Sequence, residues 1–479
     1  MSRSFVILGG GPCGLAAAWE LARRGHRPVV LEREALVGGL CATHAMTCDE
    51  GTWRFDLGGH RFVSSDADLS RWLERLLGDE LLTQERKSVV LHDGRRFKYP
   101  LDARDLLANL GVRENALALT GYAIERARRA IRPRREATFE DWVVARFGRP
   151  LYDTFFGPYT AKLWGIAPQT ISADWAAERI SLLNLGDAVL RLAGLRATPI
   201  RTYARRYRYP RLGMGQLYER LAAEVVRLGG EVRTNARVVG LETSEGRVTA
   251  VRYVDERTRA AERVAVTELL STIALPELAR ALHPGTPDAS LRAAHALRFR
   301  SLVFLNLALR REAVSENTWM YVADGRLRIS RIQEPRRRSP SMAPAGRTSM
   351  MLEIPCDVGD DVWTSDVNTL RARFSRELGE LGFALDDVIA ASVVRVEHGY
   401  PVYHLGYDDD RRTLLTLLER FSNVRTAGRQ GLFRYVFMDA AMQMGIEAAR
   451  QMTTGEHAPA KLDAIGRAKG VLEMRAVTA

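Results

Sequence analysis

The chain has 479 residues, 46% of them hydrophobic and 27% charged, which is typical of a globular protein large enough for two or more domains. Its apolar runs fall short of the ~18 residues that cross a bilayer, so we expect no transmembrane segment. The net charge of +12 is compatible with nucleic acid, anionic lipid or an anionic small molecule as a partner. No nucleic-acid-binding motif accompanies the arginine clusters at residues 126–135, 201–211 and 336–338, so we expect no nucleic-acid partner.

The cysteines and the N-terminus exclude further classes of protein. Cys13, Cys41, Cys48 and Cys356 form no C-x-x-C pair and no cluster with histidine, so neither a metal site nor a disulfide framework is indicated. The apolar N-terminal stretch has no cationic region before it, so we expect no signal peptide and a cytoplasmic protein.

A strand, a tight glycine turn and a helix are predicted at the start of the chain. The apolar run from Phe5 ends in a G-x-G-x-x-G pattern at Gly9, Gly11 and Gly14, and residues 15–24 repeat apolar side chains at helical spacing. Backbone N–H groups and the helix dipole would point at an anion there, and no Cβ would block its approach. The alternative is a glycine turn without a ligand.

A second strand and an acid complete a dinucleotide-binding pattern. The predicted strand at residues 28–31 is followed by Glu32, close to where a ribose-binding acid is expected. An acid there suits the unphosphorylated ribose of FAD or NAD. The agreement of strand, helix, second strand and acid favours dinucleotide binding. Gly38 and Gly39 follow, and Glu-x5-Gly-Gly resembles the fingerprint of FAD-binding oxidoreductases of the amine oxidase type, so we expect FAD.

A glycine-flanked histidine comes next. Residues 55–62 form an extended piece that turns at Gly58 and Gly59 and presents His60. An isolated loop histidine is usually structural. Its position behind a Gly-Gly turn, shortly after a dinucleotide unit, favours a functional role.

Helical spacing predominates in the following segment, at residues 67–77, 101–135, 139–147, 152–156 and 175–183. The aromatic residues between 156 and 165 are typical of a core, and they can also line a cofactor site. Arg179 lies among apolar residues of the last helix, so its five donors need an anion or a carboxylate, either Glu178 or a substrate phosphate.

The remaining chain returns to the first domain and builds a second sheet. A helix at 216–228 and strands at 231–233, 238–243, 247–253 and 269–273 complete the FAD sheet; strands at 302–310, 319–332 and 349–354 form another. A helix at 367–381, a strand at 393–397, a strand at 424–428 and a helix at 438–452 follow. The N-terminus of the last helix is placed to receive the flavin O2. Beyond Gly455 we expect a partly ordered tail.

These elements predict an α/β fold with a discontinuous, Rossmann-type (GR-type) FAD-binding domain and an inserted substrate domain of mixed sheet plus helices. The expected parts of the FAD-binding domain are 1–65, 209–275 and 393–455. The expected helical substrate or capping segment is 66–208, the substrate-domain sheet 276–392 and the C-terminal tail 456–479.

The ordered motifs resemble the UDP-galactopyranose mutases, within the wider protoporphyrinogen oxidase and amine oxidase superfamily. The resemblance runs from Gly9 to about Arg450 and includes the histidine loop, the tryptophan segment 158–164, the helical Arg179 and Arg331 in Ile-Ser-Arg-Ile. It implies catalytic roles for His60, Arg179 and Arg331. It implies FAD contacts at Gly9, Gly11, Pro12, Cys13, Gly14, Glu32, Arg33, Gly38, Gly39, Leu40, Gly58, Gly59, His60, Val238, Gly428, Arg429, Met438 and Asp439. The implied substrate contacts are Tyr99, Leu101, Asp102, Thr160, Trp164, Arg179, Tyr321, Arg331, Tyr400 and Tyr435.

Two departures concern the substrate. Thr160 stands where the family has an asparagine, and Leu101 and Asp102 stand where mutases read the uracil base. Because an acid at that position can accept from the N–H groups of guanine, the base stays open among UDP, GDP and dTDP. Independently of the family, two arginines offer forked donors to a diphosphate and tyrosines add uncharged donors, which favours a nucleotide-diphosphate sugar over an apolar substrate.

The resemblance implies a redox-neutral pyranose/furanose isomerisation in which N5 of reduced FAD attacks the anomeric carbon and the arginines hold the departing diphosphate. Such an enzyme needs an external reductant, either NADPH or a reductase. A net FAD-dependent oxidation of a sugar, isoprenoid or secondary metabolite by an oxidase, dehydrogenase or desaturase is the alternative. A third possibility is a flavin-bearing scaffold or a basic protein on an anionic membrane.

Overall fold

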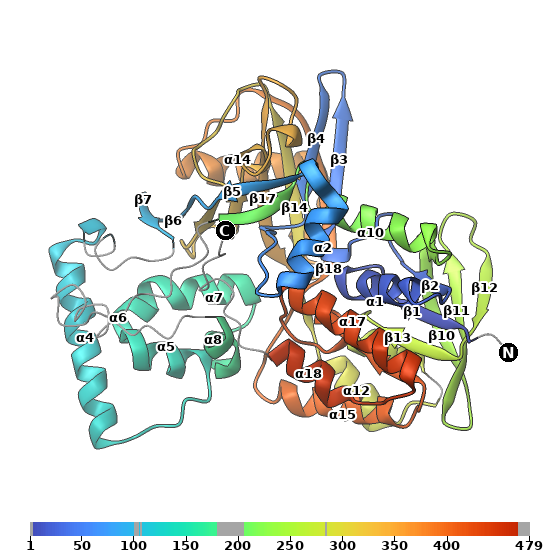
Figure 1. Cartoon of the computed structure of the whole chain (residues 1–479). Helices are drawn as coiled ribbons and strands as arrows, with labels where there is room; N and C mark the ends of the chain where they lie inside the picture. Colours follow the sequence, from blue (N-terminus) through green and yellow to red (C-terminus); the bar gives the residue numbers. More distant parts are fainter. Residues whose placement is uncertain (1–2, 100–104, 106–107, 180–205, 283–284, 468–479) are drawn as a thin grey trace.

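The computed structural model describes residues 3–99, 105, 108–179, 206–282 and 285–467. Figure 1 shows two sheet-containing bodies side by side and a group of helices at one end, furthest from the three-stranded sheet β10–β12. The strands and helices of each body come from separated parts of the chain, so the first sheet combines strands from residue 5 to residue 426.

The first sheet is parallel, with the strand order β19-β13-β1-β2-β9. Its central strand β1 is wholly buried, as a parallel strand covered on both faces should be. The strands are β1 (Phe5–Leu8), β2 (Pro28–Leu31), β9 (Glu231–Arg233), β13 (Glu268–Ser271) and β19 (Val424–Thr426).

Helices α1 (Pro12–Arg23), α10 (Gly215–Arg227) and α17 (Met438–Thr454) pack beside one another against this sheet. The antiparallel meander β10 (Ala236–Ser244), β11 (Arg247–Asp255) and β12 (Ala261–Ala265) follows β9. A small helical group adjoins it: α11 (Leu275–Ala281), α12 (Asp288–Ala296) and α15 (Tyr407–Glu419).

The second sheet is mixed, with the strand order β18-β14-β17-β16-β15-β6-β7. Every pairing is antiparallel except β15 with β6. The strands are β6 (Ser88–His92), β7 (Arg95–Lys98), β14 (Phe299–Leu309), β15 (Trp319–Val322), β16 (Arg331–Gln333), β17 (Thr348–Cys356) and β18 (Val388–Pro401). Helix α14 (Val367–Glu380), with α13 (Asp361–Thr364) before it, packs on β14 and β18.

Hairpins and short helices connect the two bodies. The hairpin of β3 (Thr43–Cys48) and β4 (Gly51–Asp56), helix α2 (Ala67–Leu77), and the pair β5 (Leu81–Glu85) and β8 (Arg206–Pro210) lie between them. The helices at the far end are α4 (Val112–Ile131), α5 (Phe139–Phe147), α6 (Arg149–Leu151), a π-helical turn Tyr152–Phe156, α7 (Gly157–Trp164) and α8 (Ala173–Arg179). Short 3-10 turns occur at Gly39–Cys41, Gly78–Glu80, Pro168–Thr170, Pro335–Arg337 and Pro340–Met342.

The predicted α/β class, with a Rossmann-type parallel sheet and a second, mixed sheet, is confirmed. Several local expectations differ. Strand β18 was placed with the first domain but pairs with β14 in the second sheet. The predicted strand over 319–332 is two short strands, β15 and β16, joined by a loop. The segment after Gly455, predicted as a tail, contains helix α18 (Pro459–Arg467), which packs on α17.

Candidate active site

The glycine turn between β1 and α1 brings the backbone close to an open space. Gly9 has φ +98°, a conformation that favours glycine, and a Cβ on Gly14 would lie 2.0 Å from the Gly9 carbonyl oxygen. A Cβ on Gly11 would meet no atom within 4 Å. Gly11 is the N-cap of α1, Pro12 begins the helix, and no side chain caps its first turn. This geometry fits a diphosphate at the helix N-terminus.

Glu32 directly follows β2, beside this turn. Its carboxylate accepts from Gly10 N at 2.6 Å and from Glu34 N at 2.9 Å, which fixes the side chain, and burial raises the pKa of the carboxyl. Arg33 next to it pairs with Glu277 and Glu397, both at 3.6 Å.

These groups line a cavity of about 1060 Å³ that runs between the two bodies. A cavity of this size and extended lining fits FAD. Of the predicted FAD contacts, those that line it are Gly9, Gly11, Pro12, Cys13, Glu32, Arg33, Gly39, Leu40, His60, Val238, Gly428, Arg429 and Met438. Five predicted contacts are not among the lining residues: Gly14, Gly38, Gly58, Gly59 and Asp439. Gly38 N donates to Gly10 O at 2.8 Å, and burial raises the pKa of Asp439 to about 6.

The C-terminal motif also lines the cavity. Gly428 begins the short helix α16 (Gly428–Gly431) with φ +82°. The Arg429 guanidinium donates to Val436 O and lies 4.1 Å from the ring centroid of Tyr435. Helix α17 begins at Met438, which lines the cavity, and no side chain caps this end of the helix. The free backbone N–H groups of the first turn therefore fit an electron-rich flavin carbonyl.

His60 lies where the cavity approaches the second sheet. Its Nδ1 is buried and makes no hydrogen bond to the described part of the chain, which fits a partner supplied by a bound cofactor or substrate. Burial and the charges of Arg429, Arg338 and Arg331 lower its pKa well below the ordinary value, so the imidazole is neutral.

Arg331 is held beside His60 by a buried carboxylate. Arg331 Nε donates to Glu353 Oε2 at 3.0 Å, and the Tyr400 hydroxyl donates to Glu353 Oε1 at 3.1 Å. A Cβ on Gly58 would lie 3.4 Å from His60 Cε1 and 3.6 Å from Arg331 Nη2, so both side chains border the same glycine. Glu353 was missed by sequence reasoning; the available signal was a single acid in the apolar strand β17.

Four aromatic residues form what we call the aromatic wall: Trp164, Trp175, Tyr400 and Tyr435. Ring centroids are 4.6 Å apart for Trp164 and Trp175, and 6.0 Å apart for the stacked Tyr400 and Tyr435. Trp164 Nε1 is buried without a hydrogen bond to a described residue. Thr160 is buried one turn before Trp164 on α7.

Three further tyrosines lie near Arg331. Tyr321 has its ring 5.8 Å from the Arg331 guanidinium and 4.6 Å from the ring of Tyr99. Tyr159, another residue missed as a site candidate, lies within the electrostatic reach of Tyr321, Arg331 and Glu353, and burial raises its pKa. Predicted residues Leu101 and Asp102 lie outside the described residues. Arg179 ends α8, and its side chain is not described.

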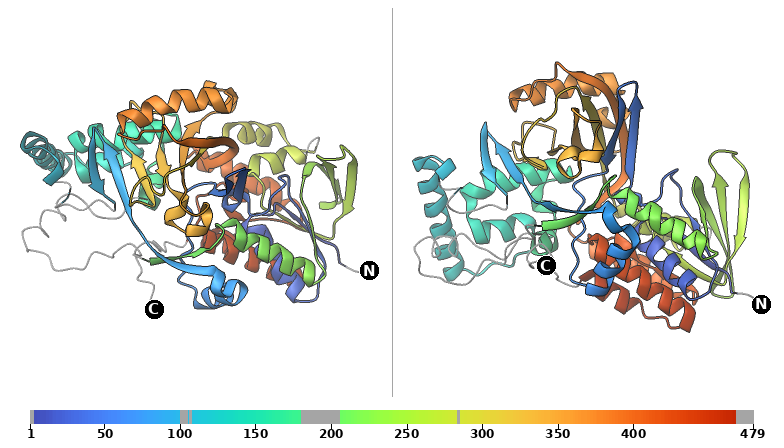
Figure 2. Two further views of the ribbon diagram at one scale, coloured as in Figure 1. Left: turned by 90° about the horizontal axis from the view of Figure 1, so that it is seen from above. Right: turned by 45° about the horizontal axis from the view of Figure 1, so that its top comes forward.

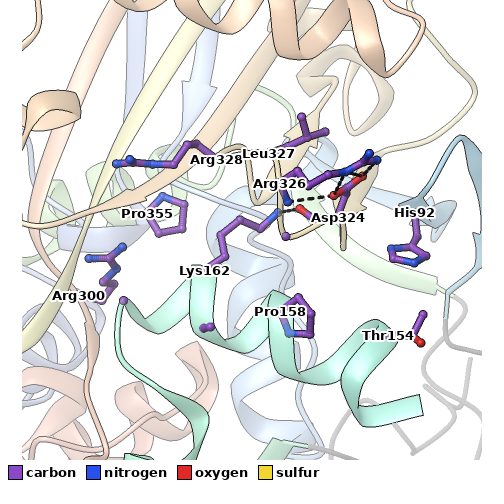
Figure 3. Close-up of a pocket in the computed structure, with 13 residues that line it drawn as sticks. His92, Thr154, Pro158, Lys162, Arg300, Asp324, Arg326, Leu327, Arg328 and Pro355 are labelled. Atoms are coloured by element: carbon purple, nitrogen blue, oxygen red, sulfur yellow. Dashed lines mark hydrogen bonds and ion pairs between the residues drawn. The ribbon is translucent and has the colours of Figure 1, made fainter. Parts of the chain in front are cut away.

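A smaller cavity of about 620 Å³ lies on the other face of α7 (Figure 3). Helical spacing puts Pro158, Ala161 and Lys162 toward it and Thr160 and Trp164 away from it. Lys162 Nζ donates to the carbonyl oxygens of Val322, Asp324 and Ile329 at 2.6–2.9 Å. The arginines there are also engaged: Arg300 pairs with Asp357, Arg326 with Asp324 and Arg328 with Asp361. The cations among the described residues of this cavity therefore already have partners within the protein.

Within the described residues, one group could hold a metal ion: Glu277, Glu397 and His398 present ligand atoms within 4.8 Å of one another. Because Arg33 already pairs with both carboxylates, the group is explained as an ion-pair cluster on the wall of the large cavity. No helix in the described part of the chain is long and apolar enough to span a membrane.

The fold resembles solved flavoprotein structures. A crystal structure of reduced UDP-galactopyranose mutase is similar with a TM-score of 0.81 and 20% identity, covering 100% of both chains. A putative protoporphyrinogen oxidase from Exiguobacterium sp. 255-15 is similar with a TM-score of 0.68 and 18% identity, covering 96% of this chain and 99% of the other. The predicted resemblance to these flavoproteins is thus confirmed at the level of the fold.

Sequence similarity to curated proteins is short. An L-amino-acid oxidase of Siganus canaliculatus is 39% identical over 80 residues, which is 17% of this chain and only 15% of that protein. The family model described as flavin containing amine oxidoreductase matches residues 12–453, and membership implies FAD as the cofactor. The chain belongs to the family of flavin-containing amine oxidoreductases.

Proposed function

We propose that the protein is a flavin-dependent pyranose/furanose mutase that acts on a nucleotide-diphosphate sugar without net oxidation. The observation that carries the proposal is the placement of Arg331 beside Tyr400 and next to His60, which lines the FAD-sized cavity. Similarity over the whole chain to a structure of reduced UDP-galactopyranose mutase supports it.

Arg331 would bind the diphosphate. Its bonds to Glu353 and Tyr400 use Nε and Nη2, which leaves Nη1 for a phosphate oxygen as far as the described residues go. Glu353 orients the Arg331 guanidinium. The positive charge of Arg331 would then be shared between the Glu353 carboxylate and the diphosphate. Arg179 is the proposed second cation, and Tyr321 and Tyr435 are the proposed uncharged donors. Tyr400, whose hydroxyl already donates to Glu353, would hold that carboxylate in place beside the substrate.

The chain's remaining contributions are orientation and exclusion of water. Trp164 and Thr160 would face the sugar nucleotide from α7. The neutral His60 would exchange a hydrogen bond at Nδ1 with the bound cofactor or sugar, since that atom has no partner among the described residues. Reduced FAD, when bound, supplies the nucleophile for the anomeric carbon; NADPH or a separate reductase is the proposed source of electrons.

Net oxidation by FAD of a sugar, isoprenoid or secondary metabolite is the second candidate. Membership of the amine oxidoreductase family favours it, because the family description names that chemistry. The buried Glu353 also favours it, since Arg331 is already neutralised without a substrate phosphate.

The decisive experiment offers UDP-, GDP- and dTDP-hexoses to the dithionite-reduced, FAD-loaded protein and measures furanose products by chromatography and NMR. We expect product only from reduced protein, without stoichiometric loss of reductant. Arg331→Gln should lower the rate at least about a hundredfold, as loss of one charged donor does at such sites. Arg328→Gln, in the smaller cavity, is the matched control and should leave the rate unchanged. Oxygen consumption with an oxidisable substrate, and no response of the flavin spectrum to any sugar nucleotide, would favour the second candidate.

A further inference from the structure

Helix α4 leaves an unusual amount of apolar surface uncovered. Ala118 is its only buried residue. Five of the nine large hydrophobic side chains exposed in the described part of the chain belong to it: Val112 (88% exposed), Leu117 (50%), Leu119 (39%), Ile124 (52%) and Ile131 (79%). A helix that packs on a core normally hides such residues, so this face requires another explanation.

Three of the five exposed residues form a continuous stripe. Leu117, Ile124 and Ile131 are seven residues apart, which keeps them on one side of a helix over about 21 Å. Arg113 lies one turn before Leu117, and Arg128 lies one turn after Ile124, so cations border the stripe on the same side. In Figure 1 and in both views of Figure 2, α4 lies at one extremity of the molecule, where a flat surface can reach it.

The residues around the stripe carry an excess of positive charge. Residues 112–135 contain seven arginines and two glutamates. Glu114 is engaged by Arg95 at 2.7 Å, and Glu125 by Arg129 at 2.7 Å. The other arginines of this segment, which have no acidic partner among the described residues, are Arg113, Arg126, Arg128, Arg132, Arg134 and Arg135.

We propose that α4 docks the protein on an anionic lipid bilayer, lying in the plane of the interface with the Leu117, Ile124 and Ile131 stripe among the acyl chains and the arginines on the headgroups. Charge complementarity decides among the occupants. A second copy of this chain would bring two arginine-rich helices together without free acids to pair them. A nucleic acid would neutralise the arginines but leave the apolar stripe against phosphates. An anionic bilayer accommodates both the apolar stripe, among its acyl chains, and the arginines, at its headgroups.

The test is co-sedimentation of the FAD-loaded full chain with vesicles of phosphatidylcholine, alone or mixed with phosphatidylglycerol. We expect binding only to the mixed vesicles, weakened by salt. Arg128→Gln/Arg132→Gln should lower the partition coefficient about fivefold for each arginine removed. Leu117→Glu/Ile124→Glu/Ile131→Glu should lower it at least about tenfold. Val226→Glu and Arg220→Gln, on the exposed side of α10, are the matched controls and should bind as the unaltered protein does.

Flavin content and the melting temperature show whether each variant is folded, because no residue of α4 lines the FAD-sized cavity. Equal binding to both kinds of vesicle, or equal loss in the α10 controls, would overturn the proposal. So would a concentration-dependent dimer abolished by the apolar triple variant, which would identify a second copy as the occupant. Binding to RNA but not to anionic vesicles would likewise overturn it.

Discussion

Arg331 and Glu353 are register partners on the adjacent strands β16 and β17, and their side chains form an ion pair, 3.0 Å between Arg331 Nε and Glu353 Oε2. The Glu353 side chain is 2% exposed and the Arg331 side chain 14%. Removing one partner strands the other charge, so we expect Arg331→Met to lower the free energy of unfolding by ~3–5 kcal/mol. Arg331→Met/Glu353→Gln should recover most of that loss. Urea denaturation of the apoproteins measures the coupling, and strictly additive single effects would contradict it.

The glycine turn allows cofactor binding and folding to be separated. Gly11→Ala adds a methyl group that meets no protein atom, so the apoprotein should melt as before. The same methyl group enters the space expected for the diphosphate and should weaken FAD binding at least about tenfold, or ~1.4 kcal/mol. Gly14→Ala is the contrast: its Cβ would lie 2.0 Å from Gly9 O, so the fold itself should be destabilised. Unaltered FAD affinity in Gly11→Ala would refute the assignment of this turn.

Sequence patterns predicted the part of the site that is formed by residues close together in the sequence. The turn at Gly9 to Gly14 and the acid at Glu32 lie within one strand-helix-strand unit, so their spacing carries the information. Glu353 could not be assigned a partner in this way. Its contact with Arg331 depends on the register of two strands separated by a long connection, and a single acid in an apolar run indicates only that some partner exists.

The assignment of strands to sheets has the same limit. The pattern at residues 393–397 predicted a strand correctly, but which sheet it joins depends on its pairing with β14, nearly a hundred residues earlier. Hairpins β3/β4 and β6/β7 were not predicted because β3 and β7 are short, partly exposed strands in which polar and apolar residues mix. The tail helix α18 was missed because its apolar face is narrow and Leu462 is its only buried residue.

His60 predicts a specific dependence of stability on pH. Its pKa is lowered in the folded protein, whereas the unfolded chain has the ordinary pKa of ~6.5. Below that value the unfolded state takes up a proton that the folded state does not, so the free energy of unfolding falls as the pH falls, by at most ~1.4 kcal/mol per pH unit. Above about pH 6.5, His60 is unprotonated in both states and does not make the free energy of unfolding depend on pH. His60→Gln should flatten the dependence between about pH 5 and pH 7 in urea denaturation of the apoprotein. His295→Gln, an exposed histidine of α12, is the control, and equal flattening in both would contradict the prediction.

Substitutions on the two faces of α7 are predicted to have opposite phenotypes, and Figure 3 shows the face that carries Lys162. Lys162→Met leaves the carbonyl oxygens of Val322, Asp324 and Ile329 without their donor, so we expect the free energy of unfolding to fall by at least ~2 kcal/mol. The affinity for a sugar nucleotide should stay within about twofold, because this side chain points away from the aromatic wall.

Trp164→Phe keeps most of the buried volume, so its stability cost should be below ~1.5 kcal/mol. It removes the indole N–H and part of the wall, and the affinity should fall about tenfold. Thermal melting and titration of the flavin spectrum with sugar nucleotides measure the two effects separately. If Lys162→Met instead abolished binding without loss of stability, the smaller cavity would be the substrate site and the assignment of the two faces would be reversed.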